Sequence, residues 1–176
     1  TSISALRRLG YFQSVTYKLD EIDSNLIDII LEVKETNTGS VSFGVGYSSL
    51  NNTSFSFGLN EKNFLGEGKK VRLQVDLSEK KSSYNIGVTE PYFLDRHLSL
   101  YGDIFNQETE NTKGDIMSSS SGFGFGIGFT NDSSTQSFKY KLSISETTTS
   151  STSTAASETG EEGIEIITSS ITHSIS

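Results

Sequence analysis

The chain has 176 residues, a formal net charge of −8 and no cysteine. This length is enough for one domain with a sizeable core. The acidic balance argues against general nucleic-acid binding, and the lack of cysteine excludes disulfides, thiolate metal sites and a cysteine nucleophile. No segment approaches the ~20 consecutive apolar residues of a membrane-spanning helix, which excludes a helical membrane protein but not a barrel of alternating strands.

The first 37 residues are predicted to form a helix end followed by a hairpin. Residues 5–12, ALRRLGYF, contain the last turns of a helix that stops at Gly10. Two alternating segments, 14–19 and 26–34, are predicted strands joined by a turn over DEIDSN. One helix and two strands make only part of a domain, so we expect the chain to start inside a longer protein.

A different pattern begins at residue 39, in the segment GSVSFGVGYSSL. Its apolar residues recur at every second position, and the positions between them hold only serine and glycine. A period of two predicts a strand with one apolar face and one small, polar face.

The same alternation recurs along the rest of the chain and predicts eight strands, each near the ~9–11 residues that cross a bilayer when tilted. The later segments are TSFSFGLNEKNF, KKVRLQVDLSEK, SSYNIGVTEPYF, HLSLYGDIF, GFGFGIGF, SFKYKLSIS and the less regular IITSSITHSIS. The charged residues inside these strands fall mostly on one face: Arg72, Asp76, Asp103, Lys139 and Lys141. We therefore expect the apolar face to meet lipid and the other to line a lumen. A soluble β-sandwich shows the same alternation, but the aromatic strand ends and the small opposite face weigh against it.

The predicted connections fall alternately on two sides of the sheet. Those on the side of residues 1–37 are all short, namely LGEGK, FLDR and NDSS. Those on the far side are SLNN, EKKS, NQETENTKGD and ETTTSSTSTAASETGEEG, of which the last two are long. Short turns on one side and longer loops on the other are typical of outer-membrane barrels. We expect the Ser/Thr-rich stretch 147–159 to be mobile.

No group of residues has the spacing of a catalytic or metal site. GEGKK lacks the spacing of a phosphate-binding loop, and GFGFGIG is interpreted as a strand. His97 and His173 stand in no ligand pattern, and no nucleophile elbow is present. The acidic EEGIE segment, with Glu161, Glu162 and Glu165, is interpreted as a solvated loop rather than a cation site. We expect no enzyme activity, no cofactor and no metal.

Four segments resemble, in the same order, the BamA-type outer-membrane β-barrel assembly insertases. LRRLGYFQSV is similar to the second helix and following strand of a POTRA (polypeptide-transport-associated) domain, and LIDIILEVKETNTGSVSFGVGYSS to the last POTRA strand running into the first barrel strand. NFLGEGKKV and VTEPYFLDRHLSL resemble two turns between barrel strands. The residues of these turn motifs are Asn63, Phe64, Leu65, Gly66, Gly68, Pro91, Tyr92 and Phe93. The resemblance covers about residues 5–105.

The resemblance implies a mainly β fold. Residues 38–176 would be the N-terminal half, about eight antiparallel strands, of a transmembrane β-barrel. Residues 1–37 would be the C-terminal part of a membrane-proximal α/β POTRA domain. Since the family barrel has sixteen strands, we expect this chain to be an internal fragment.

The resemblance also implies a function. Members of the family fold and insert nascent barrel proteins into the bacterial outer membrane, with their POTRA domains in the periplasm. The implied partners are nascent outer-membrane barrel proteins, the lipid bilayer and accessory assembly subunits. The first and last barrel strands meet in a lateral gate, where a substrate strand adds to the free edge of the first strand. The gate strand would be 39–49, with Ser40, Val41, Ser42, Phe43, Gly44, Val45, Gly46 and Tyr47 at its centre.

Three alternatives stay open. Gly44 and Gly46 weaken a strand interior and would help the gate open, or they merely relieve crowding inside the barrel, as the glycines at 122–128 would. The chain could belong to a related translocator that secretes one polypeptide. It could also form a self-contained eight-stranded barrel with a structural or adhesive role.

Overall fold

The structure is a computed structural model that describes residues 2–23, 26–49, 52–111, 116–131, 134–150 and 161–176. The chain divides into two units, Thr1–Ser40 and Val41–Ser176, and each unit is described by itself. In the described ranges, no helix is long and apolar enough to cross a membrane.

The first unit contains helix α1 (Ser2–Arg8) and strands β1 (Phe12–Asp23) and β2 (Leu26–Glu35), which pair antiparallel. Gly10 has a φ of 71°, the left-handed conformation expected of a glycine just after a helix. The turn predicted over DEIDSN is too long, because Glu21 and Asp23 still pair with Ile27 and Leu26.

The core of the first unit is small. Val15 is 2% exposed, and the Arg7 guanidinium donates a hydrogen bond to the Val15 carbonyl oxygen at 3.0 Å. The apolar side chains that share the Val15 face of the hairpin are exposed: Tyr17, Leu19, Ile27, Ile29, Leu31 and Val33. The hairpin therefore presents an apolar face, which α1 begins to cover within the described residues of this unit.

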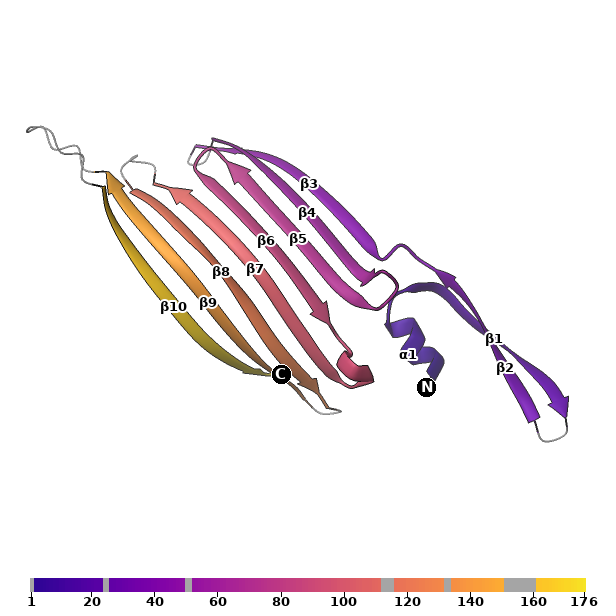
Figure 1. Cartoon of the computed structure of the whole chain (residues 1–176). Helices are drawn as coiled ribbons and strands as arrows, with labels where there is room; N and C mark the ends of the chain where they lie inside the picture. The colour runs from indigo at the N-terminus through magenta and orange to yellow at the C-terminus, as the bar shows by residue number, and fades with distance from the viewer. Residues whose placement is uncertain (1, 24–25, 50–51, 112–115, 132–133, 151–160) are drawn as a thin grey trace, which may run out of the picture. The chain divides into compact units, whose positions relative to one another are not determined.

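The second unit is one sheet of eight strands in the order β10-β9-β8-β7-β6-β5-β4-β3, so that each strand lies beside its neighbours in sequence (Figure 1). The strands are β3 (Gly39–Ser48), β4 (Asn52–Phe64), β5 (Lys69–Ser78), β6 (Lys81–Glu90), β7 (Leu98–Glu110), β8 (Ile116–Thr130), β9 (Thr135–Ser150) and β10 (Glu161–Ile175). A short 3-10 turn, η1 (Phe93–Asp95), lies between β6 and β7. The eight predicted strands are confirmed, including the irregular last one.

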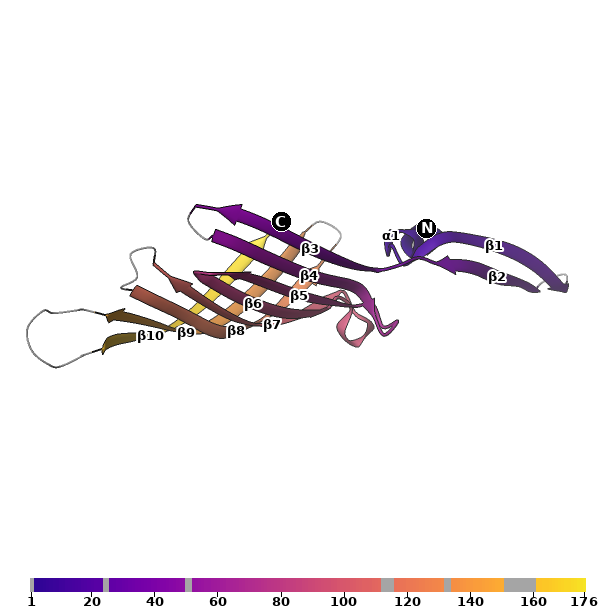
Figure 2. The same ribbon diagram turned by 90° about the horizontal axis from the view of Figure 1, so that it is seen from above.

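The sheet is curved, as Figure 2 shows, and it is open. Its two edges are β3 and β10. The concave face is the crowded one, because a Cβ added to the glycines of β8 would meet side chains or backbone of β7 and β9. Small residues on this face are what allow the sheet to curve inward.

The register places the strand charges as the alternation predicted. A single row across the sheet joins Arg72, Gly87, Asp103, Gly124 and Lys141, each the pairing partner of the next. Charged and glycine positions alternate along this row. Each charged residue therefore has glycine as its neighbour on the next strand, and glycine has no side chain to compete for the space. The opposite, convex face carries the exposed apolar side chains.

The convex face has the dimensions of a membrane belt. On β9, the outward positions Gln136 and Glu146 flank four apolar residues, namely Phe138, Tyr140, Leu142 and Ile144. The ten residue steps from Gln136 to Glu146 span about 33 Å at about 3.3 Å per step. A strand tilted by about 40° then covers about 25 Å along the membrane normal, the height of the apolar band of an outer-membrane barrel.

The last three strands are longer than predicted, with 15, 16 and 15 residues. Pairing continues beyond the apolar belt, where Ile116 still pairs with Thr149 and Glu161 with Ser150. The EEGIE segment therefore lies in β10, and its interpretation as a loop was wrong. An antiparallel ladder satisfies its own backbone groups and does not have to stop where the lipid stops. Of the stretch predicted to be mobile, residues 151–159 lie outside the described residues.

Candidate functional site

The predicted gate strand is β3, an edge of the sheet (Figure 1). Its outward side chains, Val41, Phe43, Val45 and Tyr47, are between 61% and 80% exposed. On one side β3 pairs with β4, and the Ser42 hydroxyl donates to the Gly58 carbonyl oxygen at 3.4 Å. Within the described residues no strand pairs with its other side, so β3 offers backbone N–H and C=O groups to a further strand.

The small residues of β3 and β4 interlock. A Cβ on Gly44 would overlap the Ser56 hydroxyl, and a Cβ on Gly46 would lie 3.0 Å from the Ser54 hydroxyl. A Cβ on Gly58 would in turn lie 2.6 Å from the Ser42 hydroxyl. This geometry supports crowding as one reason for the glycines of β3, while their role in opening a gate stays a prediction.

The same explanation holds more strongly at β8. A Cβ on Gly122 would overlap the Leu142 carbonyl oxygen and come within 2.8 Å of the Phe105 ring. Long side chains from both neighbouring strands occupy the space that these glycines leave. Lys139 Nζ lies 5.3 Å from the centre of the Tyr101 ring, and Lys141 Nζ lies 4.2 Å from that of Phe105. Along β7 to β9 the inner wall is therefore packed, with two lysines lying over aromatic rings.

The first turn motif forms a closely hydrogen-bonded turn between β4 and β5. The Asn63 side-chain oxygen accepts from the backbone N–H of Gly68 at 2.7 Å, and the Asn63 carbonyl accepts from Gly66 at 3.0 Å. Leu65, Gly66 and Gly68 have φ values of 58°, 78° and 72°. Two glycines at positive φ explain the glycine positions of this motif.

The second turn motif, Pro91 to Phe93, leads into η1 between β6 and β7. Leu94 within η1 has a φ of 56°, and the Tyr92 ring packs edge-on against His97 with centroids 6.3 Å apart. Phe64, Leu65, Tyr92, Phe93 and Leu94 are all exposed to at least 37%. The two motifs thus build two apolar turns at the same end of the sheet.

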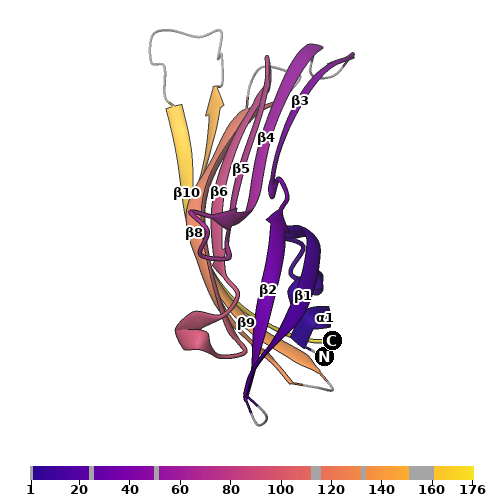
Figure 3. The ribbon, with the colours of Figure 1, turned by 90° about the vertical axis from the view of Figure 1, so that its right-hand side faces the viewer.

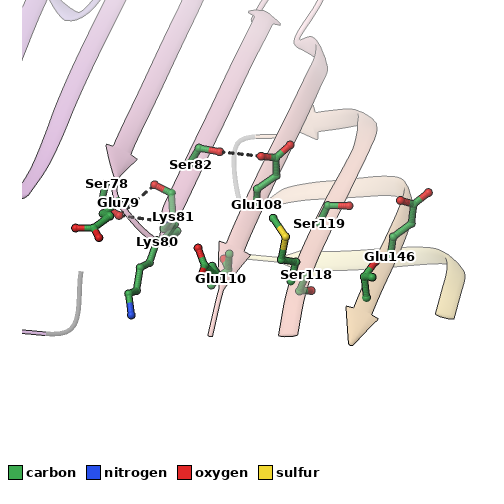
Figure 4. Close-up of a pocket in the computed structure, with 13 residues that line it drawn as sticks. Ser78, Glu79, Lys80, Lys81, Ser82, Glu108, Glu110, Ser118, Ser119 and Glu146 are labelled. Atoms are coloured by element: carbon green, nitrogen blue, oxygen red, sulfur yellow. Dashed lines mark hydrogen bonds between the residues drawn. The ribbon is translucent and has the colours of Figure 1, made fainter. Parts of the chain in front are cut away.

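A polar hollow lies at the other end of the sheet (Figure 4), between the β5–β6 turn and strands β7 to β9. Ser82 donates to a Glu108 carboxylate oxygen at 3.4 Å, and Glu146 lines the same hollow. In the described part of the chain, no group of three or more His, Cys, Asp or Glu residues is arranged to hold a metal ion. His173 stacks on Phe138, with ring centroids 4.3 Å apart, and lies far along the chain from His97.

Sequence reasoning missed three residues of these surfaces. Tyr101 and Phe105 lie on the inner face, in register with Gly126 and Gly122. Their aromatic character suggested no lumen role. The signals that could have found them were their spacing of two residues from Asp103 and the glycine run in the next strand. Leu94 was missed because no sequence pattern indicates a left-handed leucine.

Comparison with known proteins gives consistent matches. The family model of the Omp85 superfamily domain matches residues 63–176. The outer membrane protein assembly factor BamA of Buchnera aphidicola is 33% identical over 102 residues, which is 57% of this chain and 16% of that protein. BamA of Nitratidesulfovibrio vulgaris is 34% identical over 122 residues, 62% of this chain and 15% of that protein. The chain thus spans about a sixth of the length of these relatives.

The fold has a match among solved structures. The crystal structure of BamA from Haemophilus ducreyi lacking POTRA domains 1-3 aligns with a TM-score of 0.72. The alignment covers 99% of this chain and 36% of that one, at 24% identity. At this identity the likeness concerns the fold, and it agrees with the open, curved sheet described above.

Proposed function

Because the chain belongs to the Omp85 superfamily, we propose that it is part of an assembly factor that folds and inserts β-barrel proteins, with β3 as one side of a lateral gate. It is a protein of the bacterial outer membrane, as its relatives are. The proposed partners are nascent barrel proteins, the lipid bilayer and accessory assembly subunits. The proposed role needs no enzymatic step.

The observation that carries this proposal is the open edge of β3 in a sheet whose convex face is a lipid-facing belt. Backbone groups cannot stay unpaired in hydrocarbon without a cost of several kcal/mol each. An edge in that environment therefore favours a partner strand strongly, and an incoming strand of a nascent barrel satisfies it by β-augmentation. Tight and specific side-chain contacts are not required, which suits clients of different sequence.

Site-specific photo-crosslinking tests the gate. A photoreactive amino acid replaces Val45 on β3 in the full-length protein, and a matched variant carries it at Val75 on β5, an interior strand with the same outward face. We expect an assembling client to crosslink at position 45 and not at position 75. Equal crosslinking at both positions, or none at position 45 while assembly proceeds, would contradict the gate.

For the first unit we propose the C-terminal part of a POTRA domain in the periplasm, over residues 1–37, followed by the barrel part over 38–176. The exposed apolar face of the β1–β2 hairpin supports this, because Tyr17 and Ile29 remain 55% and 66% exposed and need further chain to cover them. The free edges of this hairpin are candidate sites for capturing extended substrate.

Of the alternatives, the self-contained eight-stranded barrel is disfavoured, since β3 and β10 are edges and do not pair with each other in the described residues. A secretion translocator of the same superfamily would use the lumen instead of the edge. The crosslinking experiment separates the two, because a translocated polypeptide would react with inner-face positions such as Asn85 and not with position 45.

A further inference from the structure

Two neighbouring turns carry exposed apolar residues at their tips. Both turns lie at the end of the sheet where β3 begins. The turn after β4 exposes Phe64 and Leu65, and the turn after β6 exposes Tyr92, Phe93 and Leu94. Leu65 is 80% exposed and Leu94 is 71% exposed. The next turn at the same end, after β8, is polar in its described residues, Asn131 and Ser134. The apolar tips are thus confined to the half of the sheet near β3.

The backbone at both tips makes leucine an unexpected choice. Leu65 and Leu94 have φ values of 58° and 56°, a left-handed conformation that favours glycine or asparagine and costs free energy with a larger side chain. Packing within the described chain does not repay this cost, because both side chains are largely exposed. An apolar environment outside the chain is therefore needed to account for them.

The turns continue the lipid-facing surface. Lys70 lies in an inner-face row with Thr89 and Tyr101, so its neighbour Lys69 faces outward. Phe64 pairs with Lys69 and therefore also faces outward. Both turns bend toward the convex side of the sheet in two perpendicular views (Figures 2 and 3). They extend the apolar belt rather than pointing into the lumen.

Charged groups mark the depth of these turns. Lys69 lies beside Glu67 and 3.9 Å from a Glu90 carboxylate oxygen, so an outward-facing ionic group stands at the level of the tips. Aromatic residues together with such charged groups are characteristic of the headgroup layer of a bilayer. We propose that Phe64–Leu65 and Tyr92–Leu94 form an interfacial anchor, which inserts into the headgroup region of the near phospholipid leaflet beside the β3 half of the sheet.

Tryptophan fluorescence tests the anchor directly, because the chain contains no tryptophan. The variants Leu65→Trp and Leu94→Trp, with Asn131→Trp as the control in the polar turn, are folded into vesicles of phosphatidylethanolamine and phosphatidylglycerol. We expect the emission of the first two to shift to the blue and to be quenched by phospholipids brominated near the headgroup. The Asn131→Trp emission should stay red and be quenched by aqueous iodide.

The quenching pattern distinguishes turn tips that insert into lipid from turn tips that are buried against protein. Emission at positions 65 and 94 that is quenched by iodide as strongly as at position 131 would overturn the anchor. A blue shift without quenching by brominated lipid would also overturn it, since that result means burial against protein. If a tryptophan variant does not insert, Leu65→Cys and Leu94→Cys carrying a small environment-sensitive dye give the same depth profile, because the chain has no natural cysteine.

Discussion

Glycine positions in this sheet obey two different physical rules. Gly122 lies on the inner face, where a Cβ would meet the Leu142 carbonyl oxygen and the Phe105 ring. Gly102 has nothing within 4 Å of a Cβ position and no unusual φ. The first glycine is required by its neighbours, whereas the second is free to change.

This contrast gives a matched pair of variants. Gly122→Ala should lower the free energy of unfolding by about 1–3 kcal/mol, since added volume in a packed site forces neighbours apart. Gly102→Ala should be neutral or stabilising by about 0.5–1 kcal/mol, because alanine loses less backbone entropy in a strand. Urea unfolding of the protein in lipid vesicles measures both. Equal midpoints for the two variants would refute the crowding explanation.

Crowding at the edge strand has a distinct test. Gly44→Ala should destabilise the β3–β4 pair, because the new methyl group overlaps the Ser56 hydroxyl. Ser56→Gly removes that hydroxyl, so the double variant should recover stability, with a coupling of about 0.5–3 kcal/mol. Urea midpoints of the two single variants and the double variant give this coupling. Strictly additive losses would show that Ser56 is not the reason for Gly44.

Individual residues were only partly predictable from the sequence. Alternation placed Arg72, Asp103 and Lys141 correctly on one face, because the side-chain period of a strand is two. The same period puts Tyr101 and Phe105 on the face of Asp103, but they were missed because aromatic residues were taken as lipid-facing. What only the register reveals is their contacts, with glycines of β8 and lysines of β9.

The Asn63 side chain closes the β4–β5 turn. Asn63 accepts from the Gly68 N–H at 2.7 Å in a partly buried position. Asn63→Ala should lower the free energy of unfolding by about 0.5–1.5 kcal/mol, the net worth of such a hydrogen bond. Asn63→Asp keeps an acceptor oxygen and should lose less. Urea unfolding in vesicles ranks the stability of the two variants. An Asn63→Ala variant as stable as the unsubstituted protein, together with a less stable Asn63→Asp variant, would contradict this role.

Whole elements were predicted better than their ends. Strands β3 to β9 follow from alternation, while β10 is less regular because Ile164 and Ile166 lie on the inner face, opposite Thr147 and Ser145. The ends of β7 to β10 were misplaced, since the polar residues there were taken as loop. Polar residues in water still pair along a ladder, so composition alone cannot mark where these strands stop.

The second unit has two open edges and an exposed apolar face, which no part of the described sheet covers. The chain in water without lipid or detergent should therefore associate, because edges pair and apolar surface is buried between copies. Analytical ultracentrifugation checks this, with the detergent-solubilised chain as control. A single monomeric species in detergent-free buffer would contradict it.

The candidate site depends on information that local patterns do not carry. Alternation predicts β3 as a strand, but its place at an edge follows from how many strands the sheet has and from how they close. The resemblance of the turn motifs supplied that context before the structure did. The left-handed leucines of the anchor had no such guide, because φ values depend on the whole turn.

The two faces of the sheet also have consequences for how the protein can change over evolution. On the convex face, a residue meets fluid lipid chains, so Val, Leu, Ile and Phe are interchangeable and substitutions there should accumulate independently of one another. On the concave face, a Cβ on Gly124 would overlap the Asp103 carboxylate, so these two positions share one space. A larger residue at one position must be matched by a smaller one across the strand pair. Lineages should therefore drift freely outside and change in coupled pairs inside.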